Sequence, residues 1–103
     1  MIDVQSEVVS LEEAVVRVFG EVDMNTSPKL RDVLLPAAKQ KLKKVTIDLG
    51  GVTYMDSSGI ATLVEMLQLT LAHKGQLILK SLTPQVKAVF EIAHLTEVFS
   101  IVE

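Results

Sequence analysis

One stretch decides how this chain folds: VTIDLGGVTYMDSSGIATLVEMLQLTL, at residues 45–71. Apolar and polar side chains alternate over residues 45–49, which is the two-residue period of a strand with one face in a core. Gly50 and Gly51 interrupt that pattern, so we expect the strand to end there. Beyond Met55 the apolar residues follow helical spacing along one stripe, made of Ile60, Leu63, Val64, Leu67 and Leu71. The stretch predicts a strand, a short connection and a helix.

The change from strand to helix falls on Asp56, Ser57 and Ser58. These residue types are favoured at helix N-caps, where a side-chain oxygen accepts a hydrogen bond from a free amide of the first turn. The N-terminal end of a helix also carries a partial positive charge. The sequence therefore places two hydroxyl groups at the positive end of the central helix.

Toward the N-terminus, two β-rich runs at residues 2–8 and 15–19 are separated by a polar segment and predict a hairpin. Residues 20–23 end the second run. Thr26-Ser27-Pro28 then predicts the start of a helix, because Ser or Thr can cap it and proline suits its first position. Its predicted buried stripe is Leu30, Val33, Leu34, Ala37 and Ala38. Pro36 lies inside this helix, where we expect a kink and not a break.

Toward the C-terminus, the central helix is expected to end near His73-Lys74-Gly75, with Gly75 in the left-handed conformation. Residues 76–80 follow as a strand. Thr83-Pro84 opens a third helix whose buried face is predicted to carry Val86, Val89, Phe90 and Ala93. Residues 97–102 read as a final strand at the edge of the sheet.

This order of elements predicts an α/β fold with a mixed sheet of four to five strands. The N-terminal hairpin is antiparallel, and the later βαβ crossovers require parallel, right-handed pairing. Helices are expected mainly on one face, because the other face carries polar residues such as Thr46 and Asp48. At 103 residues, the chain is expected to form a single domain, residues 1–103.

Composition excludes several classes of protein. Apolar residues make up 49% of the chain, which fits a globular core and not a disordered segment. The net charge of −3 argues against nucleic acid as a partner, and the lysines at 39, 41, 43 and 44 fit a solvated helix end. Cysteine is absent, so neither a disulfide nor a thiolate site is expected. No secretion signal or apolar run of about 20 residues is visible, so we expect a cytoplasmic protein without a membrane partner.

Several roles are open to the two serines. They could simply cap the helix. A nucleophilic serine needs a base, yet His73 is expected on the order of 20 Å away, at the far end of the same helix, and His94 follows the third helix. Oxygen ligands from Glu21, Asp23 and Asp56 would suit Mg²⁺ or Ca²⁺, but they lack the spacing of a ligand loop. Catalysis and a resident metal are therefore both disfavoured, and no cofactor is expected.

Phosphorylation is the remaining role, and the position of the two serines favours it. A phosphate adds a charge of about −1.5 to −2 and three acceptor oxygens, which the amides and dipole of a helix N-terminus can stabilise. The same charge is repelled by Asp56. Asp23 ends a strand and could come near Ser57, because functional groups gather at the carboxyl ends of parallel strands. A modified serine could thus leave the fold intact and change a docking surface.

The motif YMDSSGI at residues 54–60 resembles the phosphorylation motif of the bacterial anti-sigma factor antagonists, which are members of the STAS domain family. GEVD at 20–23 and SPKLR at 27–31 resemble the family's earlier signature. TPQV at 83–86 and FEIAHL at 90–95 match its C-terminal region more loosely. The resemblance extends in register over nearly the whole chain.

The resemblance implies a STAS fold and a regulatory protein that is not an enzyme. In that family, the unphosphorylated antagonist binds an anti-sigma factor that is also a serine kinase and so frees a sigma factor; a PP2C-type phosphatase resets the phosphorylated form. The implied acceptor is Ser57, with Ser58 as the capping hydroxyl. Asp23 and Asp56 are implied in acceptor geometry and kinase docking, and Gly59 leaves room for an approaching backbone. A weak homodimer through the first strand is left open.

Two positions depart from the family pattern. Ala61 stands where a second glycine is usual, which adds only a methyl group, and His94 stands where glycine commonly precedes the leucine after the third helix. His94 either abolishes a left-handed helix end or is specific to a partner. The alternative function is a STAS scaffold or accessory subunit in a transport or stress-signalling assembly, without phosphorylation as a switch.

Overall fold

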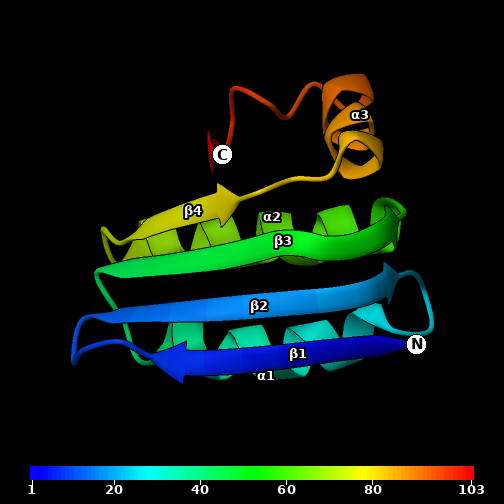
Figure 1. Cartoon of the computed structure of the whole chain (residues 1–103). Coiled ribbons are helices and arrows are strands. Elements are labelled where there is room, and N and C mark those ends of the chain that lie inside the picture. Colours follow the sequence, from blue (N-terminus) through cyan, green and yellow to red (C-terminus); the bar gives the residue numbers. More distant parts are fainter.

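The computed structural model describes residues 1–103 as five strands and three helices (Figure 1). In chain order these are β1 (Ile2–Val8), β2 (Glu13–Val22), α1 (Ser27–Lys39), β3 (Lys44–Met55), α2 (Ser57–Ala72), β4 (Gln76–Lys80), α3 (Pro84–Ile92) and β5 (Ser100–Val102). None of the helices combines the length and the apolar character that crossing a bilayer requires.

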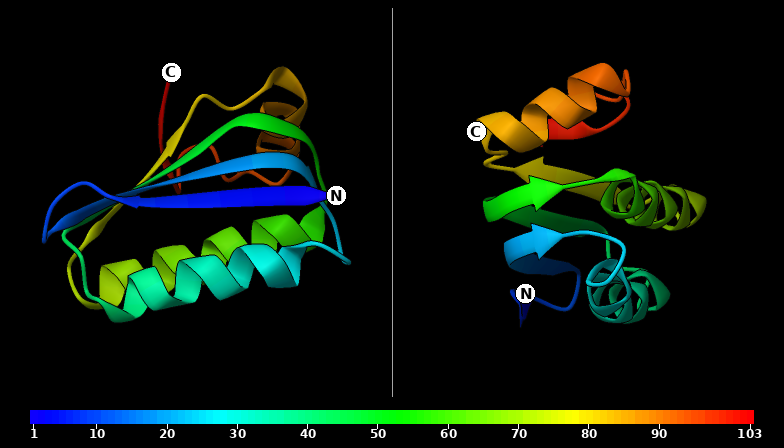
Figure 2. Two further views of the ribbon diagram at one scale, coloured as in Figure 1. Left: turned by 60° about the horizontal axis from the view of Figure 1, so that its bottom comes forward. Right: turned by 90° about the vertical axis from the view of Figure 1, so that its right-hand side faces the viewer.

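The five strands form one sheet in the order β1-β2-β3-β4-β5. β1 and β2 are antiparallel, and every later neighbour is parallel, which confirms the predicted hairpin and crossovers. α1 and α2 lie side by side under one face, whereas α3 lies apart from them, near the β4 side of the sheet (Figure 2). The polar side chains of Thr46 and Asp48 are half-buried on the other face, as expected.

The prediction that Gly50 and Gly51 end the central strand was wrong, because β3 continues to Met55. A side-chain carbon on Gly51 would collide with the ring of Phe19 on β2, so glycine here permits close packing of two strands. Shifts of register on β2 around Phe19 and Gly20 accommodate the crowding. The longer strand carries the chain to the carboxyl end of the β2–β3 pair before α2 begins.

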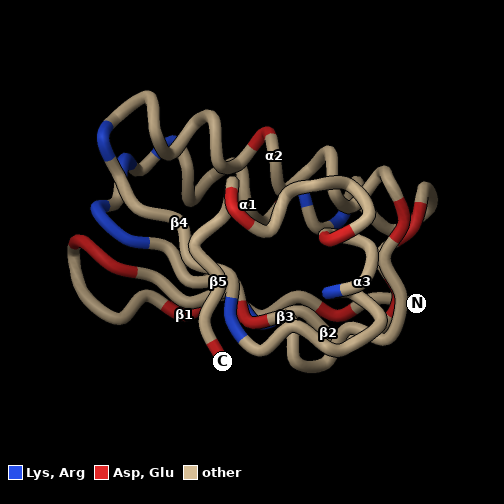
Figure 3. Tube along the Cα trace, turned by 90° about the horizontal axis from the view of Figure 1, so that it is seen from above, with Lys and Arg blue, Asp and Glu red and all other residues tan.

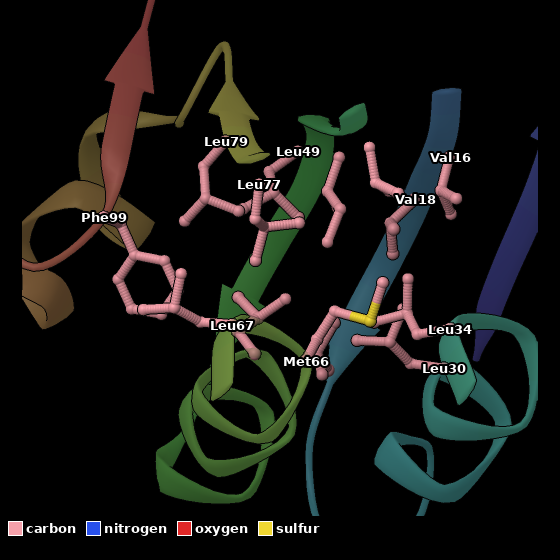
Figure 4. Close-up of a cluster of buried hydrophobic side chains, with 14 of the residues drawn as sticks. Val16, Val18, Leu30, Leu34, Leu49, Met66, Leu67, Leu77, Leu79 and Phe99 are labelled. Carbon is pink, nitrogen blue, oxygen red and sulfur yellow. The ribbon is translucent and has the colours of Figure 1, made fainter. Parts of the chain in front are cut away.

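The core lies between the sheet and the two helices α1 and α2 (Figure 4). Strand residues such as Val16, Val18, Leu77 and Leu79 face helix residues such as Leu34 in this layer. The C-terminal part closes one side, where the rings of Phe90 and Phe99 meet edge to face with their centres 5.5 Å apart. The predicted stripe of α1 is confirmed for four buried residues, Leu30, Leu34, Ala37 and Ala38, whereas Val33 is half-buried. The helix also continues through Pro36.

The stripe of α2 differs from the prediction, because Leu71 is 59% exposed and Thr62 and Thr70 are buried in the core. Each threonine hydroxyl donates to a backbone carbonyl one turn earlier: Thr62 to Ser58 at 3.0 Å, and Thr70 to Met66 at 2.7 Å. Burial of these polar groups is inexpensive because each hydroxyl donates a hydrogen bond. On α3, Ala93 is exposed, and it follows the end of the helix.

All three helices end in a residue with left-handed backbone that is not glycine. These residues are Lys41, Lys74 and His94, with φ angles of 54°, 63° and 58°. Gly75 was expected to hold this conformation, but it lies one residue later, where a side chain would come within 2.8 Å of the carbonyl oxygen of Leu42. His94 therefore does not abolish the left-handed helix end, and it adopts that conformation itself.

Replacing His94 with glycine is expected to stabilise the protein by about 1 kcal/mol, because left-handed backbone costs other residues about 1–2 kcal/mol. Urea unfolding followed by circular dichroism measures the change as a higher midpoint. Ala93→Gly is the matched control, since Ala93 has a φ of −80° and glycine there should destabilise. Equal midpoints for His94→Gly and the wild type would contradict the assigned strain.

Candidate functional site

The candidate site lies where β2 and β3 end side by side and α2 begins (Figure 1). Val22 and Met55 are register partners at the ends of these parallel strands. The pairing extends by one bond, because the Asp56 amide donates to the Val22 carbonyl at 3.1 Å. The turn that follows β2 is thereby held against the first turn of α2, although the two are more than 30 residues apart along the chain.

Asp56 is the N-cap of α2, as the sequence predicted for this position. Its Oδ1 accepts hydrogen bonds from the Ser58 amide at 2.9 Å and from the Ser58 hydroxyl at 2.6 Å. The Ser58 hydroxyl lowers the pKa of Asp56 most, and burial opposes this; backbone amides of Ser58, Gly59 and Met24 lower it further. The carboxylate therefore stays ionised and holds Ser58 by two hydrogen bonds.

Ser57 is placed differently from its neighbour. It is the first residue of α2 and is exposed, whereas Ser58 is half-buried. No hydrogen bond within the chain holds the Ser57 hydroxyl, because Asp56 is engaged with Ser58. Of the two hydroxyl groups that the sequence put at this helix end, Ser57 has the one that is exposed and makes no hydrogen bond within the chain.

Asp23 lies in the neighbouring turn, and its carboxylate is occupied there. Oδ1 of Asp23 accepts from the amides of Asn25 at 2.9 Å and Thr26 at 3.1 Å. The Thr26 hydroxyl donates to the Glu21 carbonyl at 2.7 Å and accepts from the Asp23 amide at 2.9 Å. Thr26 thus fixes this turn and makes no side-chain cap for α1, contrary to the expectation that a hydroxyl would cap it.

Gly59 is buried beneath the helix end. A side-chain carbon at this position would lie 2.7 Å from Cγ1 of Val22 and 2.8 Å from Cγ of Met55. Such contacts are closer than packed carbon atoms tolerate. Glycine therefore lets the first turn of α2 approach the ends of both strands, and its missing side chain serves packing within this chain.

Sequence reasoning missed two exposed apolar residues at the site, Met24 and Tyr54. Met24 is 78% exposed in the turn after β2, and Tyr54 is 41% exposed beside its register partner Glu21. A methionine within a polar turn has no neighbour to pack against, which is the signal that could have identified it. Exposed side chains of this kind are typical anchors of protein interfaces.

The other chemical groups considered from the sequence do not gather here. His73 caps the opposite end of α2, where its Nε2 lies 2.9 Å from the Leu42 carbonyl oxygen, and His94 follows α3. No three acidic or histidine side chains come together as a metal site would require. The arrangement offers one free hydroxyl at a positive helix end, flanked by an ionised carboxylate.

Removing the cap with Asp56→Ala is expected to cost about 1 kcal/mol at neutral pH. Since the folded-state pKa of Asp56 is lowered, its contribution is present above the ordinary carboxyl range and is lost as the pH falls below about 4. Urea midpoints of both proteins should converge in acid. Asp56→Asn keeps the acceptor without the titration and should stay close to wild type at neutral pH. A difference in urea midpoint between Asp56→Ala and wild type that stayed constant across the pH range would contradict this prediction.

Comparison with known proteins identifies the family of this chain. The family model described as the STAS domain matches residues 3–103. An anti-sigma-B factor antagonist from Staphylococcus aureus (strain NCTC 8325 / PS 47) is 30% identical over 88 residues, which are 85% of this chain and 82% of that protein.

Two solved structures of the anti-sigma factor antagonist SpoIIAA resemble the fold. The unphosphorylated form is 27% identical, with a TM-score of 0.83 over 96% of this chain and 87% of its own. The phosphorylated form, from Bacillus, is 26% identical, with a TM-score of 0.76 over 96% of this chain and 90% of its own. The chain therefore belongs to the STAS domain family and is a relative of the anti-sigma factor antagonists.

Proposed function

We propose that this protein is an anti-sigma factor antagonist that is switched by phosphorylation of Ser57. In the unphosphorylated state it binds an anti-sigma factor that is also a serine kinase, and a sigma factor is released. The observation that carries the proposal is the contrast between the two serines: Ser57 is exposed and unbonded, while Ser58 is held by Asp56 at 2.6 Å. The relationship to antagonists known in both phosphorylation states supports it.

The switch follows from the position of Ser57 at the first residue of α2. A phosphate there meets the free amides and positive end of the helix, so the fold tolerates it. It also stands beside the ionised carboxylate of Asp56, so the local surface becomes strongly negative. A partner that fits the neutral surface then meets charge that it must desolvate or repel, and the complex is lost.

The docking surface in this proposal comprises the two segments that meet at the site. Asp23 and Asp56 supply the acidic groups, and Ser58 and Gly59 keep the helix end in place. Met24 and Tyr54 add exposed apolar anchors. Such a surface, apolar at its anchors and charged around them, suits a reversible protein interface.

The proposed role is binding and not catalysis. The kinase supplies ATP and magnesium, so this chain needs no cofactor, and a PP2C-type phosphatase would restore the serine. A cytoplasmic location follows from the proposed partners, which control transcription.

The test is phosphorylation of the purified protein by a candidate anti-sigma factor kinase, followed by mass spectrometry. Wild type is expected to gain one phosphate, and Ser57→Ala none. Ser58→Ala should still be phosphorylated, although it is less stable because it loses the bond to Asp56. Full phosphorylation of Ser57→Ala would remove Ser57 as the acceptor. Binding without any phosphorylation would favour the scaffold function instead.

A further inference from the structure

A groove lies at the opposite end of the molecule from Ser57, between the last turns of α1 and α2. Its volume is about 390 Å³. Figure 2 shows the two helices running side by side in the same direction, so both C-terminal ends meet here. The distance from Ser57 to the end of α2 is about 24 Å, at 1.5 Å per helical residue. The groove is therefore separate from the candidate phosphorylation site.

The groove has an apolar floor formed by residues at helical spacing on the two facing helices. α1 contributes Leu35 and Ala38, and α2 contributes Leu69 and Ala72. Leu69 is 40% exposed and makes no part of the core. The two alanines present only methyl groups, so another helix could approach closely and pack its side chains between the ridges.

The rim of the groove is basic. Lys39, Lys41 and His73 line it, and no carboxylate does. Figure 3 shows lysine and arginine gathered at this end of the molecule. Lys39 and Lys41 form no ion pair. In contrast, the nearby Lys43 and Lys44 each pair with an acidic residue, Glu12 in the β1–β2 turn at 3.3 Å and Glu13 at the start of β2 at 3.9 Å.

The charge pattern indicates which helix the groove would accept. An apolar floor with unpaired cations at its rim is complementary to an amphipathic helix with acidic flanks. A second copy of this chain does not offer one, because α1, α2 and α3 each contain a single carboxylate: Asp32, Glu65 and Glu91. The complementary helix must belong to a different protein.

We propose that this groove binds an acidic amphipathic helix of a second protein partner. Leucine-like side chains of that helix pack against Leu35 and Leu69, and its aspartates or glutamates face Lys39 and Lys41. Because the groove and Ser57 lie at opposite ends of α2, a partner in the groove leaves the surface around Ser57 uncovered. The inference does not depend on the proposed function.

The probe is a synthetic peptide with leucine at i, i+3, i+4 and i+7 and glutamate elsewhere, titrated into the full ¹⁵N-labelled chain. Amide shifts are expected to be confined to residues 35–41 and 69–74. A matched peptide with lysine in place of every glutamate should not bind. Shifts spread over other surfaces, no shifts at all, or equal binding of both peptides would overturn the proposal.

Two variants test the contacts. Lys39→Glu combined with Lys41→Glu is expected to weaken peptide binding about tenfold or more, since it replaces two attractions with repulsions. Lys87→Glu, an exposed lysine on α3, is the control and should change nothing. Leu69→Ser should weaken binding while the circular dichroism spectrum stays the same. Binding to vesicles of phosphatidylglycerol without a response to the peptide would assign the groove to membranes and overturn the proposal.

Discussion

Ser57→Asp is expected to weaken binding to the anti-sigma factor about a hundredfold and to leave the fold unchanged. The aspartate places a negative charge beside Asp56, whose lowered pKa keeps it ionised. Like charges brought together in an interface cost several kcal/mol, and about 2.8 kcal/mol corresponds to a hundredfold change in Kd. The fold tolerates the change because Ser57 is exposed and aspartate is favourable in the first turn of a helix. Isothermal titration calorimetry measures the affinity.

A control variant separates the effect of charge on binding from the effect of side-chain size. Ser57→Asn has nearly the same size as Ser57→Asp but is neutral, so it should retain most of the affinity. Far-UV circular dichroism and thermal melting should be close to wild type for both variants. Equal affinities of wild type and Ser57→Asp would contradict the switch mechanism, whatever the extent of phosphorylation by the kinase.

Phe90→Ala is expected to lower the free energy of unfolding by about 3–5 kcal/mol. Phe90 is fully buried and packs edge to face against Phe99, which joins α3 to the segment before β5. Its removal leaves a cavity and loses the aromatic contact, worth about 0.5–1.5 kcal/mol by itself. A domain of this size is stabilised by about 5–15 kcal/mol in total, so the variant is expected to be marginal.

Urea unfolding gives the change in free energy. Ile92→Ala is the matched control, because Ile92 is on the same helix but 80% exposed, so its loss should cost less than about 0.5 kcal/mol. Figure 4 shows Phe99 on the same side of the core as Leu67, Leu77 and Leu79. If Phe90→Ala lowered the free energy of unfolding as little as Ile92→Ala, α3 would contribute little to the core.

The order of elements was predictable because local patterns specify it. Alternating residues in β3 and the cap of α2 at Asp56 each agree with the structure. The bounds of β4 (Gln76–Lys80) were also predicted correctly, since a polar turn and a proline limit a short apolar run. The site was located in the same way, because residues of N-cap type stand where the strand pattern changes to the helical pattern.

Other features could not be read from local patterns. The length of β3 depends on Phe19, which lies more than 30 residues away and packs against Gly51. Thr62 and Thr70 appear polar in the sequence but are buried, because the helix itself supplies their hydrogen-bond acceptors. The left-handed residues at Lys74 and His94 violate the preference for glycine, since the position is set by where the chain must turn toward the next element.

The sequence by itself determined that a strand gives way to a capped helix at Asp56, Ser57 and Ser58, since short-range hydrogen bonding and periodicity suffice for that. The resemblance had already implied Ser57 as the acceptor, but only the tertiary structure showed how the two hydroxyls differ in exposure and hydrogen bonding. It joined the turn after β2 to the start of α2 through the bond from Asp56 to Val22, and it engaged Asp56 with Ser58. The bond from Ser58 to Asp56 is local, but the exposure of each serine depends on how distant segments pack around the helix end, and Ser57 is left exposed.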